Sequence, residues 1–219
     1  FSHRMIPSLY LSGDFLEYIR FGAEHLGFYI ADVSGHGVSS AFVTALLRHF
    51  SLNIHRETRE ATLDGKPIPF PTPADAMAYY NRELLAAGID KYATIFMGLI
   101  DTVHNTLTYS VAGHLPMPIL VSGDSAQYLK GSGMPVGILR EAEYQNVTVQ
   151  LPETFTLVLC SDGVLEILPA DNLLDKEAVL LERVAASDRT QQGVEQALDL
   201  DCVSGAPDDI AVMTLVKTA

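Results

Sequence analysis

The sequence predicts a mixed α+β domain, with a central block of strands between two helical blocks. Apolar residues recur at helical spacing before residue 92 and again after residue 170, whereas β-rich runs bounded by turn residues fill the stretch between them. At Asp32 and again at Asp162, an apolar strand ends in an aspartate that is followed by a glycine and then a helix. The 219 residues are enough for one large domain or two small ones.

The composition argues against nucleic acid and membranes as partners. The chain has 14 basic and 27 acidic residues, a formal charge of −13, which disfavours binding to nucleic acid or anionic lipid. No apolar run approaches the ~20 residues that span a bilayer, and no secretory signal is present. Cys160 and Cys202 both lie in or beside apolar runs, which predicts two buried, inert thiols in a reducing compartment. We therefore expect a soluble, cytoplasmic protein without nucleic-acid or membrane partners.

The N-terminal region predicts a connector and a strand interrupted by a bend. Residues 1–7 read as the end of a connector, and because the chain begins at Phe1 without a methionine, we expect a fragment of a longer protein. A strand is predicted over 9–11, and it resumes over 15–20. Asp14 lies between these runs, where it is either a turn residue or a metal ligand.

The stretch after residue 27 organises the rest of the chain. Residues 28–31 form an apolar run suited to a buried strand, and Asp32 stands where that strand ends. Gly35 and Gly37 then allow a sharp turn into a helix over 39–59. Asp32 either caps this helix or presents a carboxylate at the edge of the core. The loop lacks the Lys-Ser/Thr pair of a P-loop and the three-glycine spacing of a dinucleotide fold.

A loop, a helix and the strand block come next. The proline-rich segment 65–73 cannot continue a helix, and a second helix opens at 72 or 73 and runs to 85. The strand block is predicted as a meander followed by a strand pair, over residues 93–100, 107–111, 116–121, 126–129, 147–151 and 155–159. The glycine-rich stretch 130–137 is either a border of the substrate groove or a plain connection.

The last part of the chain repeats the arrangement seen at Asp32. Asp162 follows an apolar strand and precedes a glycine and a short helix over 164–168. Helices are predicted over 170–186 and 190–200. Asp208 then precedes a final strand over 210–216 that has few polar interruptions.

Four aspartates share one kind of position, because each lies at the edge of a predicted strand. They are Asp14, Asp32, Asp162 and Asp208. Side chains from distant positions can converge at such edges, and converging carboxylates repel one another unless protons or cations neutralise them. No Cys/His ligand spacing accompanies them, so an all-oxygen set favours Mg²⁺ or Mn²⁺ over zinc. For each aspartate alone, a turn or a helix cap is the competing interpretation.

Five motifs in this order resemble those of the PPM-type metal-dependent serine/threonine phosphatases, in particular their bacterial SpoIIE/RsbU branch. The motifs are Ser12-Gly-Asp14, Asp32-Val-Ser-Gly-His-Gly37, Ala112-Gly-His114, Ser161-Asp-Gly163 and Asp208-Asp209. The resemblance implies a four-layer α-β-β-α sandwich of two mainly antiparallel sheets flanked by helices. It also implies that residues 1–219 are a single phosphatase domain, the C-terminal part of a longer regulator.

The resemblance further implies a centre of two Mg²⁺ or Mn²⁺ ions. In it, Asp32 bridges both ions, Asp162 and Asp208 complete one coordination sphere, and the main-chain carbonyl of Val33 reaches the other. Asp14 also serves this metal centre. The ions would acidify a shared water that attacks phosphorus in line.

Other residues receive supporting roles. His36 is the candidate general acid that protonates the leaving alkoxide, unless a metal-bound water does so. Glu17 is expected near the site, beyond the metal ligands, and Arg20 is a candidate phosphate-binding cation. His114 is either a structural histidine beside a strand end or a supporting residue near the site. A serine-nucleophile hydrolase is disfavoured, because no serine of these motifs lies in a Gly-x-Ser-x-Gly elbow.

The expected function is removal of phosphate from phosphoserine or phosphothreonine in a protein. By analogy with the branch, the substrate is a phosphorylated anti-sigma-factor antagonist, an upstream receiver or sensor domain of a two-component response regulator controls activity, and a homodimer is allowed. One alternative is a catalytically weak adaptor, since Val111, Leu165 and Ala211 replace residues that the family often has. Another is a two-metal hydrolase of a nucleotide or second messenger.

Overall fold

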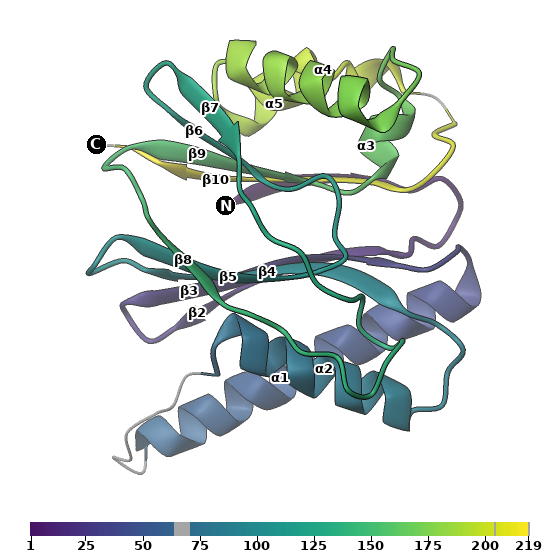
Figure 1. The fold of residues 1–219 in the computed structure, drawn as a ribbon, viewed down its shortest axis with the longest axis vertical. Helices are drawn as coiled ribbons and strands as arrows, with labels where there is room; N and C mark the ends of the chain where they lie inside the picture. Colours follow the sequence, from purple (N-terminus) through teal and green to yellow (C-terminus); the bar gives the residue numbers. More distant parts are fainter. Residues whose placement is uncertain (64–70, 204, 219) are drawn as a thin grey trace.

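The fold has four layers, two of helices and two of strands. The structure, a computed structural model, describes residues 1–63, 71–203 and 205–218. Two five-stranded sheets face each other, all named strand pairs are antiparallel, and helices cover both outer faces (Figure 1). This confirms both the α+β class and the α-β-β-α sandwich that the family resemblance implied.

The first sheet has the order β2-β3-β4-β5-β8 and packs against two helices. Its strands are β2 (Asp14–Phe21), β3 (His25–Val33), β4 (Ala93–Asp101), β5 (Thr106–Ala112) and β8 (Val147–Gln150), and its helices are α1 (Val38–Leu63) and α2 (Pro73–Ala86). Helix α2 begins after Thr72, whose side chain accepts the Asp75 N–H while the Asp75 carboxylate accepts the Thr72 N–H. This capping box fixes where α2 starts.

The second sheet has the order β1-β10-β9-β6-β7 and packs against the helices of the other outer layer. Its strands are β1 (Ser2–Ile6), β6 (Ile119–Ser122), β7 (Ser125–Tyr128), β9 (Phe155–Cys160) and β10 (Ile210–Lys217). Its helices are α3 (Gly163–Glu166), α4 (Leu173–Ala186) and α5 (Gln191–Ala197), followed by a 3₁₀ turn over Leu200–Cys202.

Residues 26–31 of strand β3 form a continuous apolar run that lies between two cores. Phe28 and Ile30 belong to the core between the two sheets, whereas Tyr29 and Ala31 belong to the core under α1 and α2. Successive side chains of a strand point to opposite faces, so a strand that is covered on both faces has no polar positions. The same burial on two faces places Asp32 at the point where this covered strand ends.

The prediction for the strand block was right about the elements and wrong about their partners. β4 and β5 form the expected hairpin, but β6 and β7 join β9 in the second sheet instead of continuing that meander. β8 pairs with β5 in the first sheet and not with β9. Local hydrophobic periodicity reports that a segment is a strand, but it carries no information about which of two stacked sheets takes it.

The N-terminal prediction was also wrong. Residues 2–6 are strand β1, which pairs with β10 at the sheet edge, and residues 9–11 are not a strand. β1 is an edge strand with exposed positions, so its apolar pattern is weak. Cys160 is buried as expected, but Cys202 is exposed. Most of the expected loop at 65–73 lies outside the described residues.

The described part of the chain has no helix with the length and apolar character needed to cross a membrane.

Candidate active site

The ends of four strands from both sheets meet at one end of the sandwich, on the right in Figure 1. In the first sheet, Asp14 at the start of β2 is the register partner of Asp32 near the end of β3. In the second sheet, β9 ends at Cys160 and β10 begins at Ile210, and Asp162 and Asp208 lie just beyond these ends. The four carboxylates are near enough to one another for the charge of one to raise the pKa of another.

The first sheet contributes the more buried carboxylates. Asp14 is 4% exposed, and its Oδ2 atom is buried without a hydrogen-bond partner. Burial raises the pKa of Asp14 to about 9, against the lowering effect of the Ser161 hydroxyl and with a further rise from nearby aspartates. Burial also raises the pKa of Asp32 to about 7, and the charges of Asp162 and Asp208 add to this rise. Both carboxylates therefore lie in surroundings that disfavour their own negative charge.

The second sheet contributes carboxylates that reach solvent. Asp162 immediately precedes α3 and makes no side-chain capping hydrogen bond there. Loss of hydration and the charge of Asp208 both raise the pKa of Asp162. A Cβ atom at Gly163 would lie 2.0 Å from the carbonyl oxygen of Asp209, so only glycine lets these two backbone segments approach. This contact sets the distance between the Asp162 turn and the Asp208 turn.

Asp209 connects the two halves of the site, a role that the sequence interpretation missed. It is 4% exposed, and its Oδ1 accepts the Ser8 N–H at 2.7 Å and the Ser8 hydroxyl at 2.8 Å. Its Oδ2 accepts the Gly13 N–H at 2.7 Å, next to Asp14. Burial alone would raise the pKa of Asp209, but these hydrogen bonds outweigh it and hold the pKa below its usual value. The sequence signal for this residue is the Asp208-Asp209 pair before a core strand, in which only Asp208 has a predicted role.

The gathered side chains fit divalent cations by their chemistry. They offer only oxygen donors, their charges raise one another's pKa, and Asp14 Oδ2 has no proton donor. An all-oxygen donor set suits hard ions such as Mg²⁺ and Mn²⁺. In the described residues, no three His, Cys, Asp or Glu side chains are arranged closely enough to form a metal site as they stand. Repulsion between carboxylates opposes a closer arrangement.

Two further predicted site residues lie on the loop after β3. Val33 ends β3, is buried, and donates its N–H to the Gly13 carbonyl at 3.2 Å. His36 is exposed on the turn before α1, and among the described residues it has no hydrogen bond or ion pair that would direct its ring. The structure thus brings Val33 beside the Asp14 segment but does not attach His36 to any carboxylate.

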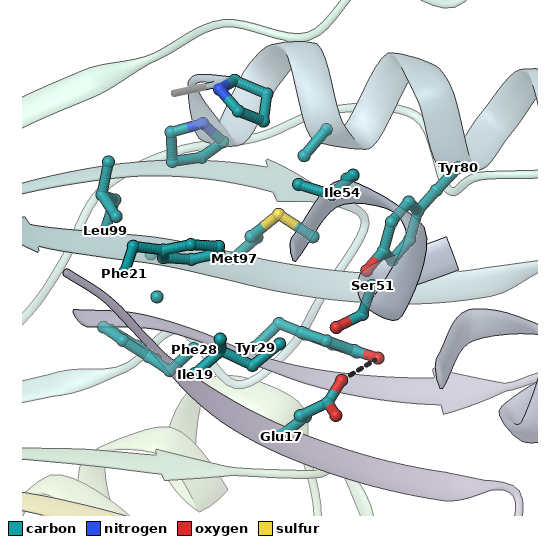
Figure 2. Close-up of a pocket in the computed structure, with 15 residues that line it drawn as sticks. Glu17, Ile19, Phe21, Phe28, Tyr29, Ser51, Ile54, Tyr80, Met97 and Leu99 are labelled. Atoms are coloured by element: carbon teal, nitrogen blue, oxygen red, sulfur yellow. Dashed lines mark hydrogen bonds between the residues drawn. The ribbon is translucent and has the colours of Figure 1, made fainter. Parts of the chain in front are cut away.

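Glu17 faces away from the aspartates. It lies three residues after Asp14 on β2, so the two side chains point to opposite faces of the sheet. Figure 2 shows Glu17 at one end of a pocket under α1 and α2, where it accepts the Tyr29 hydroxyl at 3.3 Å. The expectation of a supporting position near the metal ions is therefore wrong for this residue.

Arg20 and His114 have structural positions. Arg20 lies near the far end of β2, roughly 20 Å along the strand from Asp14, and donates to the Ala23 carbonyl at 3.3 Å. His114 is buried and its Nε2–H donates to the Cys160 carbonyl at 3.1 Å. Burial lowers the pKa of His114 to about 4, although the carbonyl of Cys160 opposes this effect. His114 thus supports the strand end that precedes Asp162, as a neutral ring.

Comparison with known proteins identifies the family of this chain. The family model described as Stage II sporulation protein E (SpoIIE) matches residues 22–217. Phosphoserine phosphatase RsbU of Bacillus subtilis is 24% identical over 174 residues, which are 78% of this chain and 48% of the relative. Phosphoserine phosphatase RsbP of the same organism is 25% identical over 205 residues, 88% of this chain and 48% of the relative. The chain spans about half the length of these curated relatives.

Solved structures share the fold. The PP2C phosphatase domain of SpoIIE from Bacillus subtilis, solved with a fragment of its regulatory domain, has a TM-score of 0.78 and 20% identity, covering 99% of this chain and 62% of that one. RsbX in complex with magnesium has a TM-score of 0.70 and 14% identity, covering 99% of this chain and 94% of that one. With the family model spanning nearly the whole sequence, the chain belongs to the SpoIIE family of PP2C-type phosphatases.

Proposed function

We propose that this domain is a Mg²⁺- or Mn²⁺-dependent phosphatase that hydrolyses phosphoserine or phosphothreonine in a protein. One observation carries the proposal. Four aspartates from both sheets gather at one end of the sandwich, and one of them, Asp14, has a buried carboxylate oxygen without a partner. Family membership agrees with this activity, and two relatives are named phosphoserine phosphatases.

The residues that would hold two ions are those of the aspartate cluster and one carbonyl. The ions would be held by the carboxylates of Asp14, Asp32, Asp162 and Asp208 and by the main-chain carbonyl of Val33. When bound, such ions supply an acidified water and charge stabilisation for the phosphoryl oxygens.

The chain itself supplies access and proton handling. Asp162, Asp208 and His36 are exposed, so a phosphorylated side chain on the surface of another protein can approach this end of the sandwich. His36 is the candidate donor of the proton to the leaving alkoxide oxygen. Ser34 and Ser161 are poorly placed to act as nucleophiles, because Ser34 Oγ accepts the Tyr92 N–H and Ser161 Oγ, which is buried, accepts the Ala211 N–H.

The substrate and the regulation belong to the same proposal. The proposed substrate is a phosphorylated anti-sigma-factor antagonist, and the proposed control element is an upstream receiver or sensor domain. The names of the RsbU and RsbP relatives, both phosphoserine phosphatases, support a phosphoserine in that substrate. Both relatives are about twice as long as the matched region, which leaves room for such a domain in proteins of this kind.

Metal-dependent hydrolysis tests the proposal directly. Wild type is assayed with Mn²⁺ on an aryl phosphate and on a phosphoserine peptide, beside Asp32→Ala and Asp162→Ala. Asp124→Ala, at an exposed aspartate in the β6–β7 turn, is the matched control. We expect activity that requires Mn²⁺, falls at least about 100-fold in both site variants and is unchanged in the control.

A folded wild type without turnover under Mn²⁺ excess would contradict the proposal. Binding of a phosphoprotein without hydrolysis would then favour the adaptor alternative. Hydrolysis of a cyclic nucleotide instead of the phosphopeptide would favour the second-messenger alternative.

A further inference from the structure

The turn that follows Asp32 is held by a segment far away in sequence, the connection between α2 and β4. The Ser34 N–H donates to the Tyr92 carbonyl at 2.9 Å, and the Tyr92 N–H donates to Ser34 Oγ at 3.2 Å. The Lys91 ammonium donates to the Ser34 carbonyl at 2.6 Å. All three polar groups of Ser34 are therefore engaged by two consecutive residues of this connection.

The connection that carries Lys91 is itself well anchored. The Lys91 N–H donates to the Ile89 carbonyl at 2.8 Å, and Ala93 and Val136 exchange two backbone hydrogen bonds at 3.0 Å. The buried side chain of Asn81 on α2 accepts the N–H of the residue after Val136 at 2.8 Å. Because its backbone is fixed from several directions, Lys91 presents its side chain from a defined position.

Lys91 has no acidic partner. Within the described residues no carboxylate lies within ion-pair distance of its ammonium group, and its hydrogen-bond acceptor is the main-chain carbonyl of Ser34. Gly35 makes the approach possible, since a Cβ atom at this position would lie 2.9 Å from Lys91 Nζ. Gly35 also has φ of +72°, which disfavours other residues. A lysine used only for solubility needs neither a half-buried position nor a glycine opposite its nitrogen.

We propose that Lys91 is a positioning residue that fixes the Val33–Ser34 segment in the orientation required for cation binding. The inference rests on the proposed function, in which Asp32 and the Val33 carbonyl hold the ions. A charged donor to the Ser34 carbonyl fixes the Ser34–Gly35 peptide unit, and hydrogen bonds to charged groups are stronger than neutral ones. The neighbouring hydrogen bond from the Ser34 N–H to Tyr92 fixes the preceding unit, which carries the Val33 carbonyl. Lys91 thereby acts through the backbone and touches no substrate atom.

The direction in which Mn²⁺ affinity changes when Lys91 is replaced distinguishes this positioning role from a simple charge effect. A positive charge near a cation site weakens cation binding, so removing it would tighten Mn²⁺ binding if Lys91 acted by its field alone. If Lys91 positions the turn, removing it weakens Mn²⁺ binding. The two roles predict opposite changes in one measured dissociation constant.

The test compares Lys91→Met, Lys91→Arg and wild type, with Lys130→Met as the matched control at an exposed lysine after β7. Mn²⁺ binding is titrated by electron paramagnetic resonance of the free ion, and amide hydrogen exchange is measured at Ser34. We expect Lys91→Met to raise the Mn²⁺ dissociation constant about tenfold, as befits the loss of one charged hydrogen bond. Amide exchange at Ser34 should accelerate about tenfold, because its acceptor Tyr92 lies next to the altered residue.

Kinetics provide a third measurement. For Lys91→Met, the Mn²⁺ concentration for half-maximal activity should rise about tenfold, while the KM for an aryl phosphate at saturating Mn²⁺ stays at the wild-type value. Lys91→Arg, which keeps a charged donor, should recover most of the Mn²⁺ affinity. Lys130→Met should match wild type in every measurement.

An unchanged or tighter Mn²⁺ dissociation constant in Lys91→Met would overturn the inference, and so would unchanged exchange at Ser34. Failure of the proposed function looks different, because wild type itself would then lack Mn²⁺-dependent turnover. In that case direct Mn²⁺ binding and amide exchange still decide whether Lys91 holds the turn.

Discussion

The two sheets supply the candidate site with aspartates of contrasting character. Asp14 and Asp32 of the first sheet lie opposite each other inside a strand ladder, and burial raises their pKa values to about 9 and about 7. Asp162 and Asp208 of the second sheet lie beyond their strands and are exposed. The first half is held by strand pairing and is largely desolvated, whereas the second half faces solvent.

This difference shows where the site depends on tertiary contacts. The first half is positioned by backbone pairing between neighbouring strands, which forms with β2 and β3 themselves. The second half reaches the first through side chains that cross between the sheets. Asp209 holds Ser8 and Gly13, and His114 follows β5 and bonds to the end of β9. Variants that remove these links should lose stability, whereas variants that remove an exposed aspartate should lose activity.

The largest stability effect is expected at Asp209. Asp209→Ala leaves three donors of Ser8 and Gly13 without their acceptor, and should lower the free energy of unfolding by about 3 kcal/mol. Asp208→Ala is the matched control. This exposed neighbour accepts only one hydrogen bond, from the Asp209 N–H, so its loss should lower stability by about 1 kcal/mol or less while abolishing activity. Urea denaturation measures the stability of both variants. Equal stability of the two variants would show that Asp209 does not join the halves.

His114 links the sheets in a pH-dependent way. Burial lowers its folded-state pKa from 6.5 to about 4. Below pH 6.5 the unfolded chain binds a proton that the folded chain does not, so stability contributed by the neutral ring is lost as the pH falls toward 4. His114→Gln cannot titrate. Between pH 7.5 and 4 the wild type should lose on the order of 3 kcal/mol more than the variant. Parallel pH curves from urea denaturation would contradict this prediction.

A smaller loss of stability is expected at Ser161, whose hydrogen bonds connect the Asp162 turn to β10. Its buried hydroxyl accepts the Ala211 N–H at 2.8 Å and donates to the Asp209 carbonyl at 3.3 Å. Ser161→Ala should therefore cost about 1–2 kcal/mol of unfolding free energy, measured by urea denaturation. Ser187→Ala, at a half-buried serine whose hydroxyl bonds locally to Val184, is a control for loss of a hydroxyl. A loss at Ser161 no greater than at Ser187 would mean that the tie is dispensable.

The smallest loss of activity and stability is expected at Glu17, which belongs to the same strand as Asp14 but faces the helices. Glu17→Gln should leave Mn²⁺-dependent activity within about twofold and reduce stability by under about 1 kcal/mol. Asp14→Asn, the corresponding change on the other face of β2, should reduce activity at least about tenfold. Phosphatase assays of both variants measure this contrast. Similar losses would mean that the two faces of β2 are coupled.

The sequence by itself was sufficient for most elements and for the aspartates. Period-two and helical patterns are local properties, so the covered strand β3 and the helices α1 and α2 were predictable. The four aspartates were predictable because a carboxylate at either end of an apolar run lies at the edge of a core. The motif order also indicated the family and the layered architecture.

Tertiary structure alone decided the partners of these elements. The assignment of β6, β7 and β8 to their sheets depends on contacts between segments distant in the chain, which local periodicity does not encode. The same holds for Asp209, which bonds to residues about 200 positions away, and for Lys91, which reaches back to Ser34. Such side chains look like ordinary surface charges in the sequence, because their function depends on which distant backbone groups the fold brings within hydrogen-bond distance.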